Sequence, residues 1–584
     1  MSDNCFIDGL KILKKSSKEA VGSINEFEEF KEYMHVERPI QNELFDIIKK
    51  ANDADGPQLI LVCGGVGDGK SHTISYLKHR YPELLNNFNI HNDATESNSP
   101  DKSAIETLDE ILWPFSDNNL ENILKRDKWI VAINLGTLNN FINSEFSSNY
   151  SKLLEYIEEN NILESEVSDE VQNISENFHH VNFSDYQLYT VSNDGVKSKY
   201  IENIIGKIIG KNGENPFYRG YSGLCSNCSE KDKCPVKINY ELISNEKFRE
   251  KLIEIIIEAI IKYKLIISTR DILNFMYYLI VTPELDSHAS ENIKDKINSQ
   301  KTIDYIQSLT PYLVFEGQES SKIMKFISNL NPLNKRNKDL DLLLIELNTS
   351  ENLLNMVNSY SKFEKIPNFE NEISDGSSIS KSDKKTLIEF IIRSRLFFED
   401  SSDSMKDAIY GDYLKNLYLL NKHEKNKDIK TIHEDIKKAI YCWNGNGIGE
   451  NLLNVSTGSK QFKYLISHSL EIKPNYESFK PRSESCHELL KFLPYLQLDY
   501  SLNDTNIKIE VDYFLYELLM KIKEGYRPNK KDKSTNIKFN SQMSKISTIG
   551  SQNELYVAKI GDDEIKFKLE YDDEFKEYTI SGVR

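Results

Sequence analysis

Eight residues, from Gly64 to Ser71, have the types and spacing that can bind phosphate groups. Four residues separate the first glycine from Gly69-Lys70-Ser71, which is the pattern of a phosphate-binding loop. Glycines allow positive φ and close approach of the backbone, so that successive N–H groups can surround an anion. Lys70 would reach the β- and γ-phosphates of a nucleotide, and the Ser71 hydroxyl would bind Mg²⁺. The alternative is a glycine-rich turn with an incidental lysine.

The loop pattern therefore predicts binding of ATP, or a related triphosphate, together with Mg²⁺. The residues expected to contact the nucleotide are Gly64, Gly65, Val66, Gly67, Asp68, Gly69, Lys70, Ser71 and His72. Further upstream, His35 and Arg38 either contact the base or lie in a connection between helices.

Hydrolysis would require an acidic residue near the Mg²⁺, at the end of a neighbouring strand. The clearest such strand, residues 129–133, is followed by Asn134 rather than by an aspartate. Asn134 would then be a polar sensor of the γ-phosphate, and Asp93 or Glu96 would be the catalytic acid. The alternative for both acids is a turn that caps a helix, and hydrolysis would then be slow or absent.

Arg270 lies at the expected start of a helix, where Ser268 and Asp271 have the spacing of a capping box. An arginine here, in a helical region after the phosphate-binding part, could reach the γ-phosphate and couple hydrolysis to movement of a lid. The alternative is an ordinary surface residue at a helix end.

Three cysteines, Cys225, Cys228 and Cys234, lie close together in the sequence. The CxxC spacing lets two thiolates bind one metal ion, and the third can join from the following turn. We expect Zn²⁺, with an iron–sulfur cluster or three reduced thiols as the alternatives. Zinc needs a fourth ligand, which no neighbouring residue supplies. The candidates that folding could bring are His179, His180, Cys442 and Cys486.

Strands and helices alternate around the loop, since residues 59–63 and 129–133 are typical of buried strands and residues 72–80 and 101–115 of helices. This alternation predicts a parallel sheet. Residues 143–200 are polar and are expected to be an insertion or a set of surface helices. In a later helix, Arg393 and Arg395 face different sides and are expected to be solvated.

The expected fold class is an α/β P-loop NTPase (AAA-like) core with a Cys-rich insertion, an α-helical lid region and a C-terminal mixed, mostly β domain. The expected domains are an N-terminal helical segment (1–55), the P-loop ATPase core (56–220), the Cys cluster (221–240), a helical lid or middle region (241–440) with a linker near 367–385, and the β-rich C-terminal domain (441–584).

The chain has 584 residues, of which 91 are acidic and 73 basic, giving a net charge of -18. This charge argues against DNA binding over the whole surface, but it allows a local basic groove or a basic partner. No apolar run is long enough to span a membrane, and the first residues do not have the pattern of a signal peptide. Seven cysteines in a chain of this length suit a reducing compartment, so we expect a cytoplasmic protein.

With these residues laid out, the chain resembles the DptF-type component of bacterial restriction systems that depend on DNA phosphorothioation. The resemblance extends over nearly the whole chain, although only the phosphate-binding loop is specific by general rules. The stretches that carry it are residues 35–39, 63–72, 92–97, 130–141, 268–275, 512–516 and 525–528.

The resemblance implies an ATP-binding and ATP-hydrolysing subunit of an anti-phage restriction complex that acts on DNA lacking the phosphorothioate mark. Its partners would be DptG- and DptH-like subunits, DNA would be contacted through the complex, and a homo-oligomer is a further expectation. No clustered acidic and lysine residues of a nuclease follow a strand, so DNA cleavage is assigned to a partner. The alternative is a nucleotide-gated scaffold or signalling ATPase that assembles effector partners with little intrinsic hydrolysis.

Overall fold

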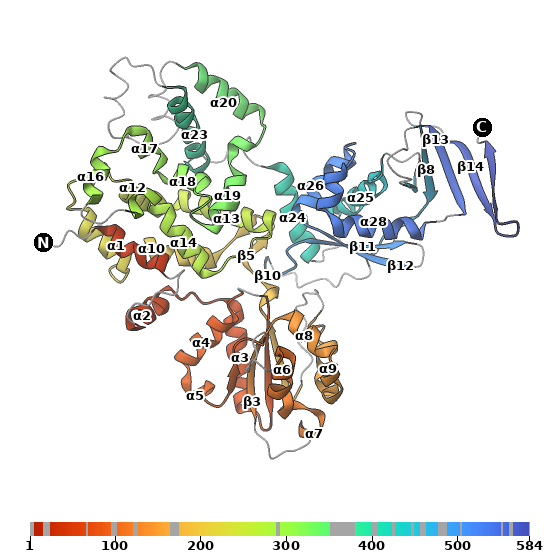
Figure 1. The fold of residues 1–584 in the computed structure, drawn as a ribbon, viewed down its shortest axis with the longest axis horizontal. Helices are drawn as coiled ribbons and strands as arrows, with labels where there is room; N and C mark the ends of the chain where they lie inside the picture. Colours follow the sequence, from red (N-terminus) through yellow and green to blue (C-terminus); the bar gives the residue numbers. More distant parts are fainter. Residues whose placement is uncertain are drawn as a thin grey trace. The chain divides into compact units, whose positions relative to one another are not determined.

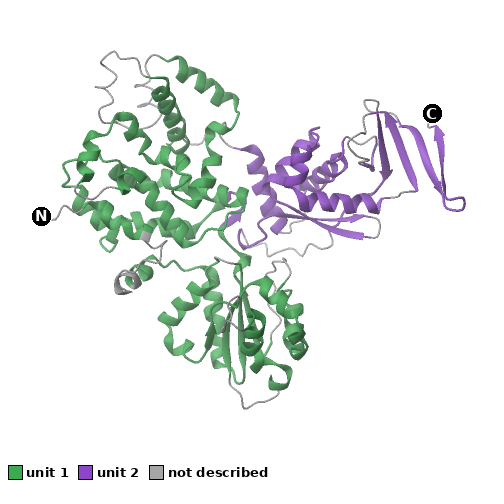
Figure 2. Ribbon diagram, viewed as in Figure 1, with its two compact units in different colours: residues 1–189, 196–406 green, residues 190–195, 407–584 purple. Residues whose placement is uncertain are grey.

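The computed structural model of the chain forms two compact units, which are coloured separately in Figure 2. Unit 1 comprises residues 1–189 and 196–406, and unit 2 comprises residues 190–195 and 407–584. The residues that the structure describes are 5–15, 24–65, 68–94, 102–120, 127–163, 175–287, 292–350, 380–398, 407–422, 427–445, 449–455, 463–476, 487–502, 505–550, 553–559 and 565–582.

Unit 1 contains a parallel four-stranded sheet in the order β2–β3–β1–β4. Its strands are β1 (Gln58–Cys63), β2 (Asn89–His91), β3 (Lys128–Ile133) and β4 (Phe178–Asn182). In the register of the sheet, Cys63 at the end of β1 lies beside Ile133 of β3 and Asn182 of β4. The carboxyl ends of these strands therefore meet at one edge, which is where open α/β sheets bind their ligands.

Helices cover both faces of this sheet (Figure 1). Ile60 and Val62 of β1 pack towards one set of helices, whereas Leu59, Leu61 and Cys63 pack towards the other. Because both faces of β1 are covered, its sequence is a continuous apolar run rather than an alternation. The first set is α3 (Pro39–Asp53), α4 (Lys70–Arg80) and α5 (Pro82–Leu85); the second is α6 (Ala104–Leu112), η1 (Trp113–Phe115), α7 (Asp117–Leu120), α8 (Leu135–Ile142), η2 (Glu145–Asn149) and α9 (Ser151–Glu159).

The strand β4 lies within residues 143–200, where we expected only an insertion or surface helices. That expectation is wrong for β4, which pairs in parallel with the central strand β1. The reason is that β4 contains two histidines and only two large apolar residues, so its burial is not evident from composition. Tertiary contacts make the burial possible, since His180 bonds to the hydroxyl of Tyr156 at 2.9 Å.

The remainder of unit 1 is mostly helical. Its elements are α1 (Phe6–Lys15), α2 (Ile24–Met34), η3 (Phe183–Asp185), β5 (Tyr186–Ser192), β6 (Gly195–Lys197), α10 (Lys199–Ile209), α11 (Pro216–Gly220), η4 (Tyr221–Cys225), α12 (Pro235–Ser244), α13 (Glu246–Tyr263), α14 (Thr269–Ile280), α15 (Pro283–Asp286), α16 (Ile293–Ser299), α17 (Thr302–Gln307), α18 (Thr310–Glu316), α19 (Lys322–Ile327), η6 (Ser328–Leu330), η7 (Pro332–Asn334), α20 (Lys338–Thr349) and α23 (Lys381–Phe398). Residues 190–195, at the end of β5 and in its turn, belong to unit 2.

A buried asparagine holds three of these helices together. The side-chain amide of Asn239, in α12, donates to the carbonyl oxygens of Ile280 at 3.1 Å and Ser308 at 2.8 Å, and its oxygen accepts from the N–H of Thr310 at 2.8 Å. These bonds satisfy backbone groups at the end of α14 and the start of α18, which would otherwise be costly to bury.

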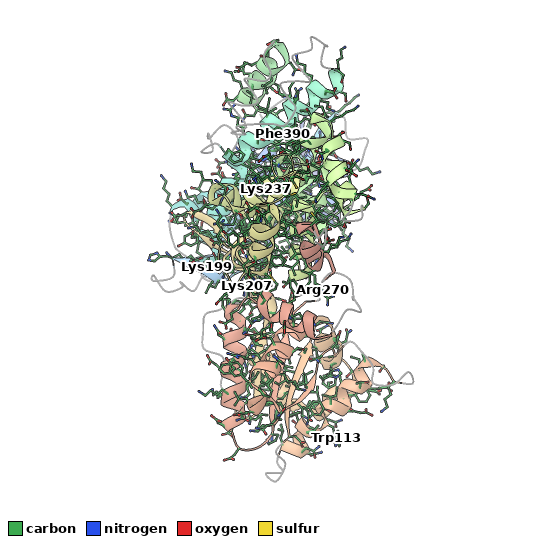
Figure 3. All side chains as sticks on the ribbon, turned by 90° about the vertical axis from the view of Figure 1, so that its left-hand side faces the viewer. Trp113, Lys199, Lys207, Lys237, Arg270 and Phe390 are labelled. Atoms are coloured by element: carbon green, nitrogen blue, oxygen red, sulfur yellow. The ribbon has the colours of Figure 1, made fainter. Side chains whose placement is uncertain are left out.

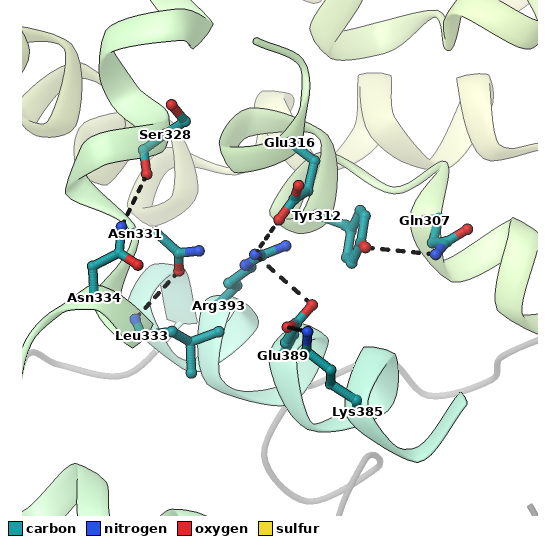
Figure 4. Close-up of polar contacts among 10 residues, drawn as sticks. All are labelled: Gln307, Tyr312, Glu316, Ser328, Asn331, Leu333, Asn334, Lys385, Glu389 and Arg393. Carbon is teal, nitrogen blue, oxygen red and sulfur yellow. Dashed lines mark hydrogen bonds and ion pairs between the residues drawn. The ribbon is translucent and has the colours of Figure 1, made fainter. Parts of the chain in front are cut away.

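Arg393 in α23 is buried, with 1% of its surface exposed, so the expectation of a solvated charge is wrong for this residue. Its Nη2 atom lies 2.6 Å from a carboxylate oxygen of Glu316 and 4.0 Å from one of Glu389. Figure 4 shows both ion pairs. Its guanidinium also lies over the ring of Tyr312, 4.8 Å from the centroid. The helix α23 packs against α17 and α18 on this side, which the spacing of two arginines does not reveal. The expected linker near 367–385 lies largely outside the described residues.

Unit 2 combines helices with two antiparallel sheets, ordered β12–β11–β9 and β15–β14–β13–β8–β7. The unit also includes helices that precede residue 441, which we placed in the middle region. Its elements are α24 (Ala408–Lys422), α25 (Lys427–Cys442), β7 (Leu452–Asn454), β8 (Tyr464–Ser469), β9 (Ile472–Pro474), β10 (Glu488–Lys491), β11 (Leu496–Leu502), β12 (Thr505–Val511), α26 (Tyr513–Lys523), α27 (Lys530–Thr535), α28 (Ile537–Ile549), β13 (Glu554–Lys559), β14 (Ile565–Asp572) and β15 (Glu577–Gly582). Among the described helices of both units, none has both the length and the apolar character that crossing a bilayer requires.

Candidate phosphate-binding site

The glycine-rich stretch connects the central strand β1 to the helix α4. The chain leaves the sheet at Gly64, with φ of 151°, and enters α4 after Gly69, with φ of 91°. A Cβ atom on Gly64 would lie 2.8 Å from the Cβ of Phe183, so only glycine fits there. Val66 and Gly67 lie outside the described residues. The helix begins at Lys70, which places its positive end at the edge of the sheet.

Lys70 points back to its own loop. Its Nζ donates to the carbonyl oxygen of Gly64 at 2.8 Å and to that of Gly65 at 2.6 Å. Partial burial lowers the pKa of Lys70, while the carboxylates of Asp68 and Asp93 act in the opposite direction. To bind a phosphate, the ammonium group would exchange these two carbonyl oxygens for phosphate oxygens.

Ser71 and Asp93 come together at the same edge of the sheet. The Ser71 hydroxyl donates to the carbonyl oxygen of Asn92 at 3.1 Å, and Asn92 and Asp93 directly follow β2. The N–H of Ala94 then donates to the carbonyl oxygen of Ala132 in β3 at 3.0 Å, which fixes this turn to the sheet. A hydroxyl and a carboxylate in this arrangement are oxygen ligands of the kind that Mg²⁺ binds, directly or through water. Glu96, the other candidate acid, lies outside the described residues.

Asn134 follows β3 and caps the helix α8. Its side-chain oxygen accepts from the N–H of Thr137 at 2.7 Å. This is the ordinary function of an asparagine at a helix start. The capping bond orients the side-chain amide, whose NH₂ group is the part that could donate to a phosphate oxygen.

Arg38 lies in the connection between α2 and α3, one of the two possibilities stated for it, and it also contacts the loop backbone, which the sequence did not predict. Its Nη1 donates to the carbonyl oxygen of Asp68 at 2.6 Å. The guanidinium also lies between the rings of Phe183 and Tyr200, 5.7 Å from each centroid. Burial lowers the pKa of Arg38, and the negative charge of Asp68 partly offsets this effect. Arg38 therefore holds the backbone of the loop rather than projecting into solvent.

The start of α14 is linked to this arrangement. The hydroxyl of Tyr200, whose ring contacts Arg38, is bonded to the hydroxyl of Thr269 at 2.6 Å. Arg270, labelled in Figure 3, is the next residue. Its positive charge is one of the causes that lower the pKa of His72 in α4, after loss of solvation and Lys31. The side chain of Arg270 is exposed, and its charge acts on His72 in the first turn of α4.

His35 contacts two aromatic side chains of α4, His72 in its first turn and Tyr76 one turn later. The ring of His35 stacks on that of Tyr76, with centroids 3.4 Å apart and an angle of 9° between the planes. Its Nδ1 atom lies 3.4 Å from Nε2 of His72. Burial, together with the positive charge that His72 can carry, lowers the pKa of His35 to about 4, so this ring is neutral at neutral pH. A neutral aromatic pair offers a flat surface for stacking. The contribution of Tyr76 was not predicted from the sequence.

The three clustered cysteines lie between α11 and α12. Cys225 and Cys234 are buried, and the N–H of Cys228 donates to the carbonyl oxygen of Cys225 at 3.3 Å. In the described part of the chain, no three His, Cys, Asp or Glu side chains are already arranged to hold a metal ion.

Of the four candidates for a fourth ligand, the two histidines bond to other residues. His179 and His180 are in β4, where they bond to Gln58 and Tyr156, respectively. Cys442 belongs to unit 2, and Cys486 lies outside the described residues.

Searches against known proteins do not assign the chain to a family. No protein-family model matches it, and no curated protein matches it. The interpretation of the site therefore rests on its own residues.

Proposed function

We propose that unit 1 binds ATP, or a related triphosphate, with Mg²⁺ and hydrolyses the bond to the γ-phosphate. The observation that carries this proposal is the meeting of Lys70, Ser71 and Asp93 at one edge of a parallel sheet. An ammonium group and backbone amides can neutralise the phosphates, and the two oxygen ligands can hold the Mg²⁺ that bridges them.

The other site residues would have distinct roles in this reaction. Asp93 would bind Mg²⁺ through water or orient the attacking water, and Arg270 would stabilise charge that develops on the γ-phosphate. The NH₂ group of Asn134 would contact the same phosphate. Arg38 would be a positioning residue, because it bonds to the loop backbone and, through Tyr200, connects it to the start of α14.

The strand order supports a P-loop NTPase of the AAA-like type. One strand, β3, separates the strand that precedes the loop from β2, which precedes Asp93. Asn134, proposed to contact the γ-phosphate, and Asp93, proposed to hold Mg²⁺, therefore follow adjacent strands.

We further propose that this ATPase is a subunit of a restriction complex that acts on DNA lacking phosphorothioate modification. This part of the proposal rests on the resemblance described above. The acidic net charge of -18 agrees with contact to DNA through partner subunits. The role would place the protein in the cytoplasm, where its DNA target is.

Replacement of Lys70 tests the proposal. We expect Lys70→Ala to abolish triphosphate binding, measured by titration with a fluorescent ATP analogue, and to abolish phosphate release. Lys78→Ala, at an exposed position of the same helix, is the matched control and should behave as the unmodified chain. Triphosphate binding that survives in Lys70→Ala would show that the site is elsewhere. Normal binding without phosphate release in the unmodified chain, tested alone and with its partners, would favour the nucleotide-gated scaffold.

A further inference from the structure

A fourth cysteine, Cys5, lies beside the three clustered cysteines although it is 220 residues away in the sequence. Its neighbour Phe6 packs edge-on against the rings of Tyr221 and Tyr240, with centroid distances of 6.0 Å and 5.2 Å. Tyr221 is in the same helical turn as Cys225, and Tyr240 is in the helix that Cys234 caps. The aromatic contacts therefore hold the start of α1 against the segment that carries the cysteines.

Electrostatic interactions agree with this placement. All six pairs among the four cysteines are close enough to influence one another, because each pair is among the causes of a cysteine pKa. Cys225 and Cys234 are buried, and Cys5 and Cys228 are half-buried, so the four thiols are largely shielded from water. A metal ion that displaces their protons would supply the attraction that gathers four sulfurs around one point.

Two of the four sulfurs also lie at helix starts. Cys5 directly precedes α1, and Cys234 is the residue before Pro235 at the start of α12. The positive end of a helix dipole favours a thiolate, which is the form that a metal ion binds.

We propose that Cys5, Cys225, Cys228 and Cys234 form a tetrahedral zinc site that joins the N-terminal helix α1 to the segment between α11 and α12. Four thiolates complete the coordination that structural zinc prefers, and four cysteines without an exchangeable ligand suit a structural rather than a catalytic ion. The helix α1 also packs on α14. Beside this contact, Lys14 of α1 forms an ion pair with Asp286 of α15, and Tyr277 of α14 donates to the same carboxylate. Zinc would therefore fix α1 against the helix that begins with Thr269 and Arg270.

Metal analysis of the purified full-length chain is the first test. We expect about one zinc ion per chain, as a single four-cysteine site requires. Clearly substoichiometric metal would overturn the proposal. Iron, with the visible absorption of an iron–sulfur cluster, would overturn the assignment of zinc.

Replacement of Cys5 separates its role from that of the other three. We expect Cys5→Ser to lose most of its zinc to a chelating dye under conditions in which the unmodified chain retains it. Cys442→Ser, at a half-buried cysteine of unit 2, is the matched control and should retain zinc. Retention of zinc by Cys5→Ser as firmly as by the control would exclude Cys5 as a ligand.

A spectroscopic measurement covers the case in which Cys5→Ser does not fold. With Co²⁺ in place of zinc, the unmodified chain should show the visible ligand-field bands of a tetrahedral ion bound by four thiolates. Cys5→His keeps a ligand at this position and should shift the bands to those of three thiolates and one nitrogen. A spectrum of three thiolates in the unmodified chain would overturn the proposal without any variant.

Discussion

At the scale of single residues, the loop is held by contacts that a phosphate could replace. Lys70 bonds to two carbonyl oxygens, and the carboxylate of Asp68 accepts from the N–H of Gly65 at 2.6 Å. The backbone N–H that the carboxylate occupies is of the kind that binds phosphate in such loops. Binding of a triphosphate would therefore exchange one set of charged contacts for another rather than order a free segment.

The position of Asp93 next to Ser71 leads to a prediction about turnover. Asp93→Asn keeps the size of the side chain but removes the charge that would hold Mg²⁺ or orient water. We expect triphosphate binding to persist and the rate of phosphate release to fall on the order of 100-fold or more. Asp53→Asn, at an exposed position near the end of α3, is the control. Hydrolysis at an unchanged rate in Asp93→Asn would assign the acid to another residue.

A buried histidine in unit 2 predicts how acid affects stability. His433 is fully buried between the rings of Tyr476 and Tyr500, and burial lowers its pKa from 6.5 to about 4. As the pH falls from about 6.5 to 4, the unfolded chain takes up a proton that the folded unit does not, so stability falls. We expect His433→Phe to reduce this loss, measured by urea unfolding at neutral pH and near pH 5.

The exposed His487 provides the control for this measurement. His487→Ala should leave the difference in unfolding free energy between the two pH values as it is in the unmodified chain. An equal loss of stability in His433→Phe and His487→Ala would show that other groups cause the acid sensitivity.

At the scale of elements, a capping box places the start of α14. Ser268 Oγ accepts from the N–H of Asp271 at 3.3 Å, and the carboxylate of Asp271 accepts from the N–H of Ser268 at 2.8 Å. Thr269 directly follows this cap and bonds to Tyr200, whose ring contacts Arg38. Arg270 is the next residue of α14. The exact start of the helix therefore matters for the site as well as for stability.

Loss of this cap should change both stability and turnover. We expect Ser268→Ala to lower the free energy of unfolding by about 1 kcal/mol and Ser268→Asp, another good cap, to restore most of it. Ser103→Ala removes the same kind of cap from α6 and should cost a similar amount. Only Ser268→Ala should also slow phosphate release, measured under saturating ATP. Equal rates of phosphate release in the two alanine variants would show that Arg270 does not take part in hydrolysis.

At the scale of the whole molecule, the chain forms two units, and we propose that ATP binds only to unit 1. Chains of more than one domain commonly unfold in more than one step. A ligand that binds the native state stabilises it by about 2.7 kcal/mol at about 100 times its Kd. We therefore expect calorimetry to show ATP with Mg²⁺ raising the unfolding temperature of unit 1 and leaving that of unit 2 unchanged.

Lys70→Ala provides the control for this shift, because it removes the binding site without removing either unit. Its unfolding profile should be the same with and without ATP. A shift of both transitions in the unmodified chain would show that the units do not respond separately to the nucleotide.

The local pattern of this sequence determined much of the core of unit 1. An apolar run, a glycine-rich loop and a following helix were evident, because each depends on neighbouring residues, and β1 and α4 lie where the pattern predicts. The strand β4 was not predicted, because it contains two histidines. Their hydrogen bonds to Tyr156 and Gln58, which lie elsewhere in the sequence, allow the strand to be buried.

Contacts between distant residues were decided only by the tertiary structure. Arg38 bonds to Asp68, Arg393 is buried against Glu316, and we propose that Cys5 shares a metal ion with Cys225, 220 residues away. The physical reason is that loop closure brings such groups together through the packing of other elements, such as Phe6 on Tyr221 and Tyr240. The sequence shows which residues can do chemistry, and the packing between them determines which ones meet.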